Sequence, residues 1–259
     1  MMQGVIAVHS YKGGTGKSLV SANLAAILAR EGKNVCVVDL DVHAPSLDKT
    51  FGVDGRKFWV NDFLAGKCEP TDILFDVAKV RKLEGKLFVA LANPSMVAIR
   101  ESVSTDKKQE MRSLRRLFTL KEHLMGKLAM DYVILDTGPG LNYASINAVT
   151  VSDIVLLLTT WDKADLSGTQ GMVSEICRML DKRSIVIMNK IPEQLIIDEA
   201  TKNRLIDQFS TTLKLPVVDL LPCYCDVLRQ DRATIMALER PRHAFSQRLV
   251  GVARHIEGI

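Results

Sequence analysis

Residues 5–18 read VIAVHSYKGGTGKS, and this stretch decides which fold the chain can adopt. An apolar, β-branched run at 5–8 precedes a glycine-rich segment, and a helix-compatible run follows as far as Arg30 before Gly32 ends it. A strand, a glycine-rich loop and a helix in this order are typical of a phosphate-binding loop, or P-loop. We therefore predict that a P-loop follows the first strand of the protein.

The residue types of this loop suit a polyphosphate. Glycines let successive backbone N–H groups curl around phosphate oxygens, and the following helix directs its positive end at the same charge. Lys17 is placed to bridge the β- and γ-phosphates, and the Ser18 hydroxyl can bind Mg²⁺. A dinucleotide-binding G-x-G-x-x-G loop fits less well, because Leu19 stands at its third glycine position. The predicted phosphate-binding residues are Gly13, Gly14, Thr15, Gly16, Lys17 and Ser18.

Two further apolar runs end in carboxylates. VCVVDLD ends at Asp39 and Asp41, and DYVILDTGPG at 131–140 carries Asp136 after its apolar strand. Ligands of open α/β sheets bind beyond the carboxyl ends of parallel strands, so these side chains should lie near the P-loop. Asp136 fits a Walker B pattern, in which a carboxylate holds Mg²⁺ through a water molecule. Asp39 and Asp41 could serve the site or simply cap the next turn.

A strand in the last third of the sequence indicates which nucleotide base the protein binds. SIVIMN ends at Asn189, and Pro192 stands where the guanine-specific N-K-x-D motif needs its aspartate. The amide of an asparagine can pair with N6 and a ring nitrogen of adenine. The sequence therefore favours ATP and ADP over guanine nucleotides.

The remaining pattern predicts a single α/β domain over residues 1–259. Helix-length segments separate most of seven short β-branched runs, which predicts a mostly parallel seven-stranded sheet with helices on both faces. The runs lie at 4–10, 34–39, 86–92, 131–136, 153–159, 184–189 and 216–221. Residues 107–127 read as a basic amphipathic helix, which fits a solvated face better than a partner or nucleic-acid surface.

Composition and charge indicate which partners and which cellular compartment to expect. The net charge of +4 and pI of 8.8 are only mildly basic, so nucleic acid is a less favoured partner. No apolar run approaches the roughly 18 to 20 residues of a membrane span, and the N-terminus shows no signal-peptide pattern. Five cysteines without framework spacing indicate a reducing compartment, so we expect the cytoplasm.

The loop KGGTGKS at 12–18 resembles the K-G-G-x-G-K-[ST] loop of the ParA/MinD/Mrp family of deviant Walker A ATPases. DVHAPSLDKTFG after Leu40 and TGPG after Asp136 resemble its two switch segments, and the MinD-like branch is the most similar. The resemblance covers nearly the whole chain, but Trp161 stands where the family usually has proline.

The resemblance implies a slow, Mg²⁺-dependent ATPase that ATP drives into a homodimer, and whose state an activating or cargo protein reads. It implies that Lys12 reaches across the dimer to the partner's nucleotide and that Asp41 positions or deprotonates the attacking water. Gly140 could bring a backbone N–H near the γ-phosphate. The implied catalytic residues are Lys12, Lys17 and Asp41; the metal set is Ser18, Asp39, Asp41 and Asp136; Asn189 and the loop at Pro222 hold the base.

Three alternatives remain open. Cys223 and Cys225 could bind a metal ion across a dimer axis, which would indicate a metal-cluster or metal-ion insertion ATPase. A nucleotide sensor that does not hydrolyse ATP is another class. The segment AFSQRLVGVARHI near the C-terminus is amphipathic, and MinD-type proteins end in a helix that lies on anionic lipid, so a membrane surface is a further candidate partner. Its apolar positions are Phe245, Leu249, Val252 and Ile256.

Overall fold

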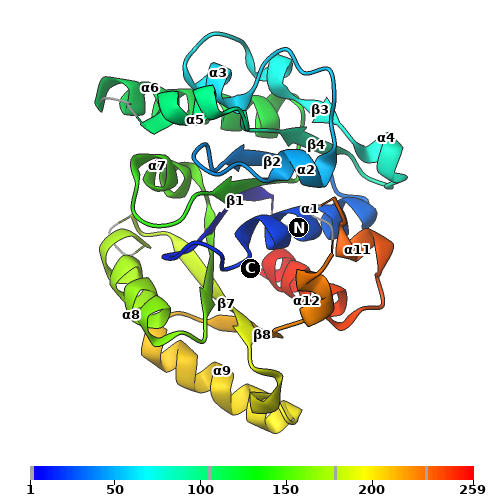
Figure 1. Ribbon diagram of the computed structural model, residues 1–259, viewed down its shortest axis with the longest axis vertical. Helices are drawn as coiled ribbons and strands as arrows, with labels where there is room; N and C mark the ends of the chain where they lie inside the picture. Colours follow the sequence, from blue (N-terminus) through cyan, green and yellow to red (C-terminus); the bar gives the residue numbers. More distant parts are fainter. Residues whose placement is uncertain (1–2, 104–106, 178–179, 231–232) are drawn as a thin grey trace.

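An eight-stranded sheet runs through the centre of the protein (Figure 1). The computed structural model describes residues 3–103, 107–177, 180–230 and 233–259. The strand order is β3-β4-β2-β5-β1-β6-β7-β8. The strands are β1 (Gly4–His9), β2 (Val35–Leu40), β3 (Phe75–Asp76), β4 (Leu87–Ala90), β5 (Tyr132–Thr137), β6 (Ile154–Thr160), β7 (Arg183–Ile191) and β8 (Val217–Pro222).

All seven predicted strands are present and pair in parallel. They are apolar along almost their whole length because helices cover both faces of the sheet. The predicted number of seven is one too few. The additional strand, β3, is two residues long and pairs antiparallel with β4 at the edge of the sheet. Two residues are too few to show a strand periodicity in sequence.

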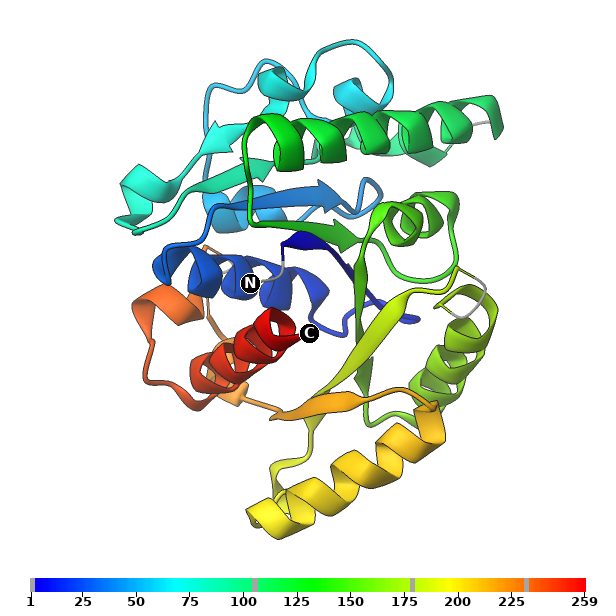
Figure 2. The same cartoon turned by 180° about the vertical axis from the view of Figure 1, so that it is seen from behind.

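Helices pack on both faces of the sheet (Figures 1 and 2). One face is covered by α1 (Lys17–Arg30), α2 (Leu47–Phe51), α4 (Ala78–Arg81), α11 (Met236–Glu239) and α12 (Ala244–Gly258). The other is covered by α3 (Val60–Leu64), α6 (Lys107–Glu122), α7 (Tyr143–Val151), α8 (Lys163–Met172) and α9 (Glu199–Leu213). Shorter elements complete the chain: α5 (Met96–Val103), α10 (Cys225–Leu228), η1 (Pro70–Ile73), η2 (His123–Lys127), η3 (Val173–Cys177) and η4 (Glu193–Leu195).

Strand register brings the predicted carboxylates together. In the parallel pair of β2 and β5, Asp39 lies directly opposite Asp136. Strand β1 pairs with β5 on the other side, and Val8 is the register partner of Asp136. The loops that follow β1, β2 and β5 therefore leave the sheet at the same edge.

The amphipathic C-terminal helix belongs to the core. Its four predicted apolar positions are at most 2% exposed, and α12 contacts α1 and β8 (Figure 2). The apolar face that suggested lipid binding is thus already covered by protein. Among the described residues, none of the helices has both the length and the apolar character needed to cross a membrane.

The predicted basic helix forms as α6 and η2, but only some of its apolar residues are buried. Leu117 and Leu120 face the core, whereas Met111 and Phe118 are 54% and 43% exposed. Arg116 is not a solvated charge, because its Nε donates to the Phe63 carbonyl at 3.1 Å. The helix therefore presents two large apolar side chains to solvent among its basic ones.

Because Leu249 is fully buried in the packed face of α12, we expect Leu249→Ala to lower the free energy of unfolding by about 2–5 kcal/mol. Arg254→Ala, on the exposed side of the same helix, should change it by less than about 0.5 kcal/mol. Urea titrations followed by circular dichroism measure both variants. Equal midpoints for Leu249→Ala and the parent protein would show that α12 does not pack on the core in solution.

Candidate functional site

The loop between β1 and α1 is shaped by glycines in conformations that other residues adopt at a cost. Gly14 and Gly16 have φ angles of 75° and 99°, and Gly16 immediately precedes α1. A Cβ atom on Gly16 would also lie 2.5 Å from Nδ2 of Asn189. The loop thus needs glycine here for both backbone conformation and space.

A cavity of about 530 Å³ extends from this loop to the start of α12. Its volume lies within the range of small-molecule sites. The P-loop, the loop after β2 and the segments after β7 and β8 contribute to its walls. Of the predicted site residues, it is lined by Gly13, Gly14, Gly16, Lys17, Ser18, Asp41, Asn189 and Pro222. Lys12, Thr15, Asp39, Asp136 and Gly140 are not among the lining residues.

Lys17 is a buried cation next to this cavity. Its residue is 6% exposed, and Nζ donates to the Ser10 hydroxyl at 2.8 Å. Burial lowers the pKa of Lys17, while Asp136 and Asp41 partly offset this effect. Within the described ranges, the Ser10 hydroxyl is the one acceptor of this buried ammonium group, an arrangement that favours an anion in the adjoining space.

Asp39 and Asp136 are fully buried behind the loop. Ser21 Oγ donates to Asp136 Oδ1 at 2.9 Å, and the Asp41 amide donates to Asp39 Oδ1 at 3.0 Å. Burial raises the pKa of Asp136 to about 6 and raises the pKa of Asp39, to which the charge of Asp136 also contributes. In the described part of the chain, Oδ2 of each carboxylate is buried without a hydrogen bond of good geometry.

These orphaned oxygens fit a hydrated Mg²⁺ ion. Hard oxygen donors are the ligands that Mg²⁺ prefers, and the ion usually keeps several of its water molecules. Ser18 lines the cavity, and its hydroxyl contributes to lowering the pKa of Asp136 against the effect of burial. The residues predicted for a metal site therefore meet at one place, with Asp39 and Asp136 behind Ser18.

Asp41 lies at the mouth of the site, against the loop that follows β5. Its Oδ1 accepts from the Ala44 amide at 3.1 Å, and a Cβ on Gly138 would lie 3.1 Å from that oxygen. Gly140, in the same loop, has a φ of 74° and donates its N–H to the Ser10 carbonyl at 3.0 Å. Its predicted contact with a γ-phosphate would require this hydrogen bond to open.

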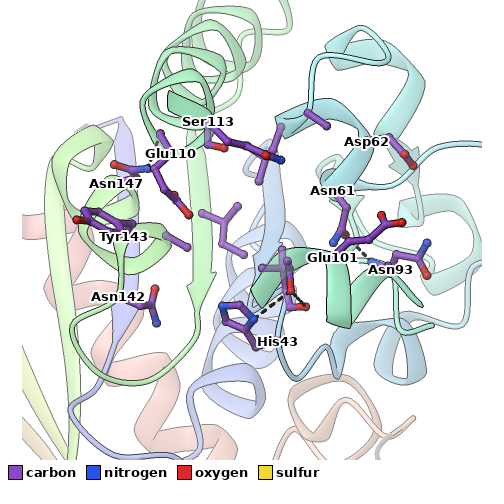
Figure 3. A pocket seen from close by; sticks show the side chains of 18 of the residues that line it. His43, Asn61, Asp62, Asn93, Glu101, Glu110, Ser113, Asn142, Tyr143 and Asn147 are labelled. Carbon is purple, nitrogen blue, oxygen red and sulfur yellow. Dashed lines mark hydrogen bonds between the residues drawn. The ribbon is translucent and has the colours of Figure 1, made fainter. Parts of the chain in front are cut away.

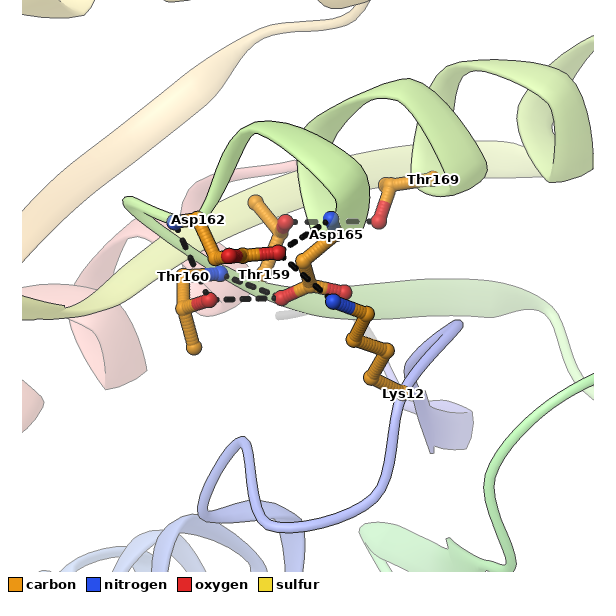
Figure 4. Close-up of polar contacts among 6 residues, drawn as sticks. All are labelled: Lys12, Thr159, Thr160, Asp162, Asp165 and Thr169. Carbon is orange, nitrogen blue, oxygen red and sulfur yellow. Dashed lines mark hydrogen bonds and ion pairs between the residues drawn. The ribbon is translucent and has the colours of Figure 1, made fainter.

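Lys12 points away from the cavity of its own chain. Its Nζ lies 2.6 Å from Asp162 Oδ1 at the start of α8, and its side chain is 42% exposed (Figure 4). The hydrogen bond to Asp162 raises the pKa of Lys12. The same Asp162 oxygen accepts the amide of Asp165 and so caps α8. Lys12 thus remains charged and partly exposed at the rim of the site.

Tyr11 packs against α8, and Trp161, which precedes α8, packs against α9. The ring of Tyr11 packs over Gly168, where a Cβ would lie 2.1 Å from the ring. Trp161, at the family's usual proline position, makes an edge contact with Phe209 of α9 with ring centroids 5.5 Å apart. Hence α8 is contacted by Tyr11 as well as by Lys12.

Asn189 braces the P-loop. Its Nδ2 donates to the Thr15 carbonyl at 2.7 Å, and its Oδ1 accepts from the Lys190 amide at 2.8 Å. Both ends of the amide are therefore engaged, although the residue still lines the cavity. Sequence reasoning missed Lys190, whose Nζ donates to the Gly14 carbonyl at 2.7 Å. Its place beside Asn189 in the N-K dipeptide was the available signal.

The far end of the cavity is apolar and aromatic. Tyr224 makes an edge contact with Phe245, with ring centroids 6.1 Å apart, and both line the cavity with Val227 and Leu228. Pro222 lies in the same wall, as predicted for the loop after β8. Tyr224 and Phe245 were missed because they come from the last sixth of the sequence, in segments without a nucleotide motif. A planar, largely apolar group such as a nucleobase would fit here.

The two cysteines that follow β8 differ in exposure. Cys223 is half-buried in the cavity wall, and Cys225 is exposed. Over the described ranges, there is no grouping of three or more His, Cys, Asp and Glu residues that could hold a metal ion.

The glycine-rich loop, the buried lysine and the paired carboxylates define a P-loop nucleotide-binding protein with the additional lysine of the deviant Walker A type. A family model described as an AAA domain matches residues 3–191. The chain belongs to this family, in its ParA/MinD-type group of P-loop ATPases.

Individual relatives agree with this assignment. The septum site-determining protein MinD of Thermotoga maritima is 27% identical over 263 residues, covering 99% of this chain and 89% of its own. The solved structure of Pyrococcus horikoshii MinD with Mg-ADP has a TM-score of 0.76 at 21% identity, over 99% of this chain and 96% of that one. The Aquifex aeolicus MinC:MinD complex gives 0.78 at 20% identity, over 98% and 96%.

The raised pKa of Asp136 predicts a pH-dependent effect of Asp136→Asn on the nucleotide-free protein. A carboxyl group with a raised folded-state pKa contributes stability at low pH that is lost as the pH rises through about 6. Because the amide cannot ionise, the variant should become more stable relative to the parent as the pH rises from 4.5 to 8. Urea midpoints at both pH values measure this, with exposed Asp207→Asn as control. If the difference in urea midpoint between the variant and the parent did not depend on pH, Asp136 would not be a buried carboxylate without a neutralising partner.

Proposed function

We propose that the protein is a Mg²⁺-dependent ATPase switch that forms a face-to-face homodimer when ATP is bound. The observation that carries the proposal is the position of Lys12. It extends from the rim of a complete phosphate cradle, yet it does not line the cavity of its own chain. A cation placed in this way can neutralise phosphate charge in a second copy, as an arginine finger does in trans. Residues 1–259 act as one domain in this proposal.

Different groups of the cavity would bind different parts of the nucleotide. Backbone N–H groups at Gly13–Gly16 and the Lys17 ammonium bind the phosphates, and the aromatic end at Tyr224 receives the adenine. Ser18, Asp39 and Asp136 would hold Mg²⁺, which neutralises phosphate charge when bound. The presence of Mg-ADP in the similarly folded P. horikoshii MinD supports this reading.

Hydrolysis would depend on Asp41. Its carboxylate lies at the cavity mouth beside the loop after β5. From there it can orient a water molecule and accept its proton, while Lys17 and the partner's lysine stabilise the charge on the transferred phosphate. Asp41 lies so close to Gly138 that a Cβ there would be 3.1 Å from Asp41 Oδ1, so a change at the phosphate would move both loops.

The ion pair between Lys12 and Asp162 would be the contact that ATP replaces. Both side chains are well exposed, at 42% and 59%, and pairs of this kind contribute little to stability. Lys12 can therefore leave Asp162 at small cost when the phosphates of a second copy offer a stronger anionic partner. Loss of the γ-phosphate would return it to α8.

A switch of this kind works by presenting a different surface in each nucleotide state. The A. aeolicus MinD is found in a complex with MinC, so an activating or cargo protein is the kind of partner that we propose. A peripheral place on a membrane, which the resemblance to the MinD-like branch implies, would need a surface other than the packed face of α12. Metal insertion through Cys223 and Cys225 is not favoured, because the relatives that support the assignment are MinD proteins.

The first test is Lys12→Ala. We expect the variant to bind ATP within about threefold of the parent affinity, because Lys12 does not line its own cavity. It should lose dimerisation with a non-hydrolysable ATP analogue and lose at least about 10³-fold in turnover. Sedimentation velocity and phosphate release measure these quantities. Lys79→Ala, exposed on α4 at the far edge of the sheet, is the matched control. A Lys12→Ala protein that still dimerises and turns over normally would refute the proposal.

The second test is Asp41→Asn, which keeps the size of the side chain. We expect turnover to fall by about 10² to 10⁴, because the amide cannot accept the proton of the water molecule. The ATP-bound dimer should persist instead of dissociating. Turnover assays and sedimentation with ATP check both expectations, with Asp207→Asn as control. If the parent protein itself releases no phosphate from ATP, it is a nucleotide sensor and the catalytic role of Asp41 is wrong.

A further inference from the structure

A second cavity, of about 650 Å³, lies among α3, α5, α6 and α7 (Figure 3). It adjoins the loops after β2 and β5, and it shares no lining residue with the nucleotide cavity. Its volume is within the range of ligand sites. None of the roles assigned so far uses it.

The lining combines an apolar base with acidic and amide groups. The apolar lining residues include Leu40, Val42, Leu64 and Leu117. Among the described residues, three carboxylates line the cavity, at Asp62, Glu101 and Glu110, and the one lining lysine, Lys67, pairs with Asp62 at 3.5 Å. Figure 3 shows these groups on both sides of the cavity, together with four asparagine side chains, Asn61, Asn93, Asn142 and Asn147. The cavity is therefore a better receptor for a cation than for an anion.

Exposed apolar side chains extend this surface beyond the cavity. Val97 and Tyr143 line it while remaining 67% and 54% exposed. Met96 and Met111, which adjoin lining residues in sequence, are 65% and 54% exposed. Aromatic and methionine side chains are enriched in protein interfaces, and a large exposed apolar surface often marks one. A small molecule held in the cavity would leave this rim uncovered.

We propose that this cavity binds a peptide segment of a partner protein that presents an arginine flanked by apolar side chains. The aliphatic stem of arginine can lie along the apolar base. Its planar, five-donor head matches carboxylate oxygens on two sides of the cavity, which a lysine ammonium does less well. The flanking apolar residues would cover Val97 and Tyr143.

The position of the cavity would let this partner sense the nucleotide, a part of the inference that rests on the proposed function. His43 lines the second cavity two residues after Asp41, which lines the nucleotide cavity. Asn142 also lines the second cavity, and its Nδ2 donates at 3.2 Å to the carbonyl of Pro139, which lines the first. Each loop thus has one side toward the nucleotide and one toward the peptide. Binding at either cavity would shift affinity at the other by the same factor.

The experiment is a selection of random 12-residue peptides displayed on phage against the full chain with a non-hydrolysable ATP analogue. Enriched peptides are synthesised, and fluorescence anisotropy measures their Kd. We expect them to carry arginine between apolar residues, and replacement of that arginine by alanine to weaken binding at least tenfold. Glu110→Gln should weaken the same peptides at least fivefold, whereas Glu122→Gln, at the exposed end of α6, should leave Kd unchanged.

Ser113→Trp would fill the cavity and abolish binding, and the urea midpoint of each variant reports that it is folded. Failure to enrich any peptide, or binding that is indifferent to both the arginine and Glu110, would overturn the proposed site. Enrichment of acidic peptides, or tighter binding of DNA than of any peptide at this face, would overturn it as well.

The dependence of peptide binding on the nucleotide state is measured separately. A Kd that differs at least fivefold between the ADP and ATP-analogue states supports the coupling, and equal values refute it while leaving the ATP switch intact. Peptide binding in a protein that never dimerises with ATP would instead refute the proposed function and leave the cavity assignment standing.

Discussion

The site depends on keeping Asp39, Asp136 and Lys17 buried beside one another at one edge of a parallel sheet. Register places Asp39 opposite Asp136, and the P-loop brings Lys17 to the same edge. Burial raises the pKa of both carboxylates and lowers that of the lysine, so each charge is unfavourable without a partner of opposite sign. A polyphosphate with a divalent cation would satisfy all three groups together, whereas a neutral ligand would leave them uncompensated.

Two lysines five positions apart illustrate how the environment separates their roles. Lys17 is buried at the start of α1 and donates to Ser10, whereas Lys12 is exposed and paired with Asp162. A buried lysine is fixed in the cradle of its own chain, and an exposed lysine can exchange one anionic partner for another. The loops after β2 and β5 show a similar division, because each contributes residues to both cavities.

Much of the fold could be read from local patterns. The loop at residues 12–18 carries its own conformational requirements in its glycines, and the seven longer strands each contain a short apolar run. The edge strand at Phe75 and Asp76 was missed, because its existence depends on pairing with β4 rather than on its own residues. In α6, the spacing identified a helix but not which apolar residues face the core, since basic residues also have apolar stems that cover neighbouring surface.

The sequence alone thus determined the phosphate loop, the order of strands and helices, and the carboxylates that follow the strands, because each is encoded within a few neighbouring residues. Only the tertiary structure decided that the apolar face of α12 lies on α1 rather than outside, and that Tyr224 and Phe245 close the nucleotide cavity. It also decided that Lys12 pairs with Asp162 and that a second cavity adjoins the loops after β2 and β5. These features come from contacts between residues far apart in the chain, which local periodicity cannot specify.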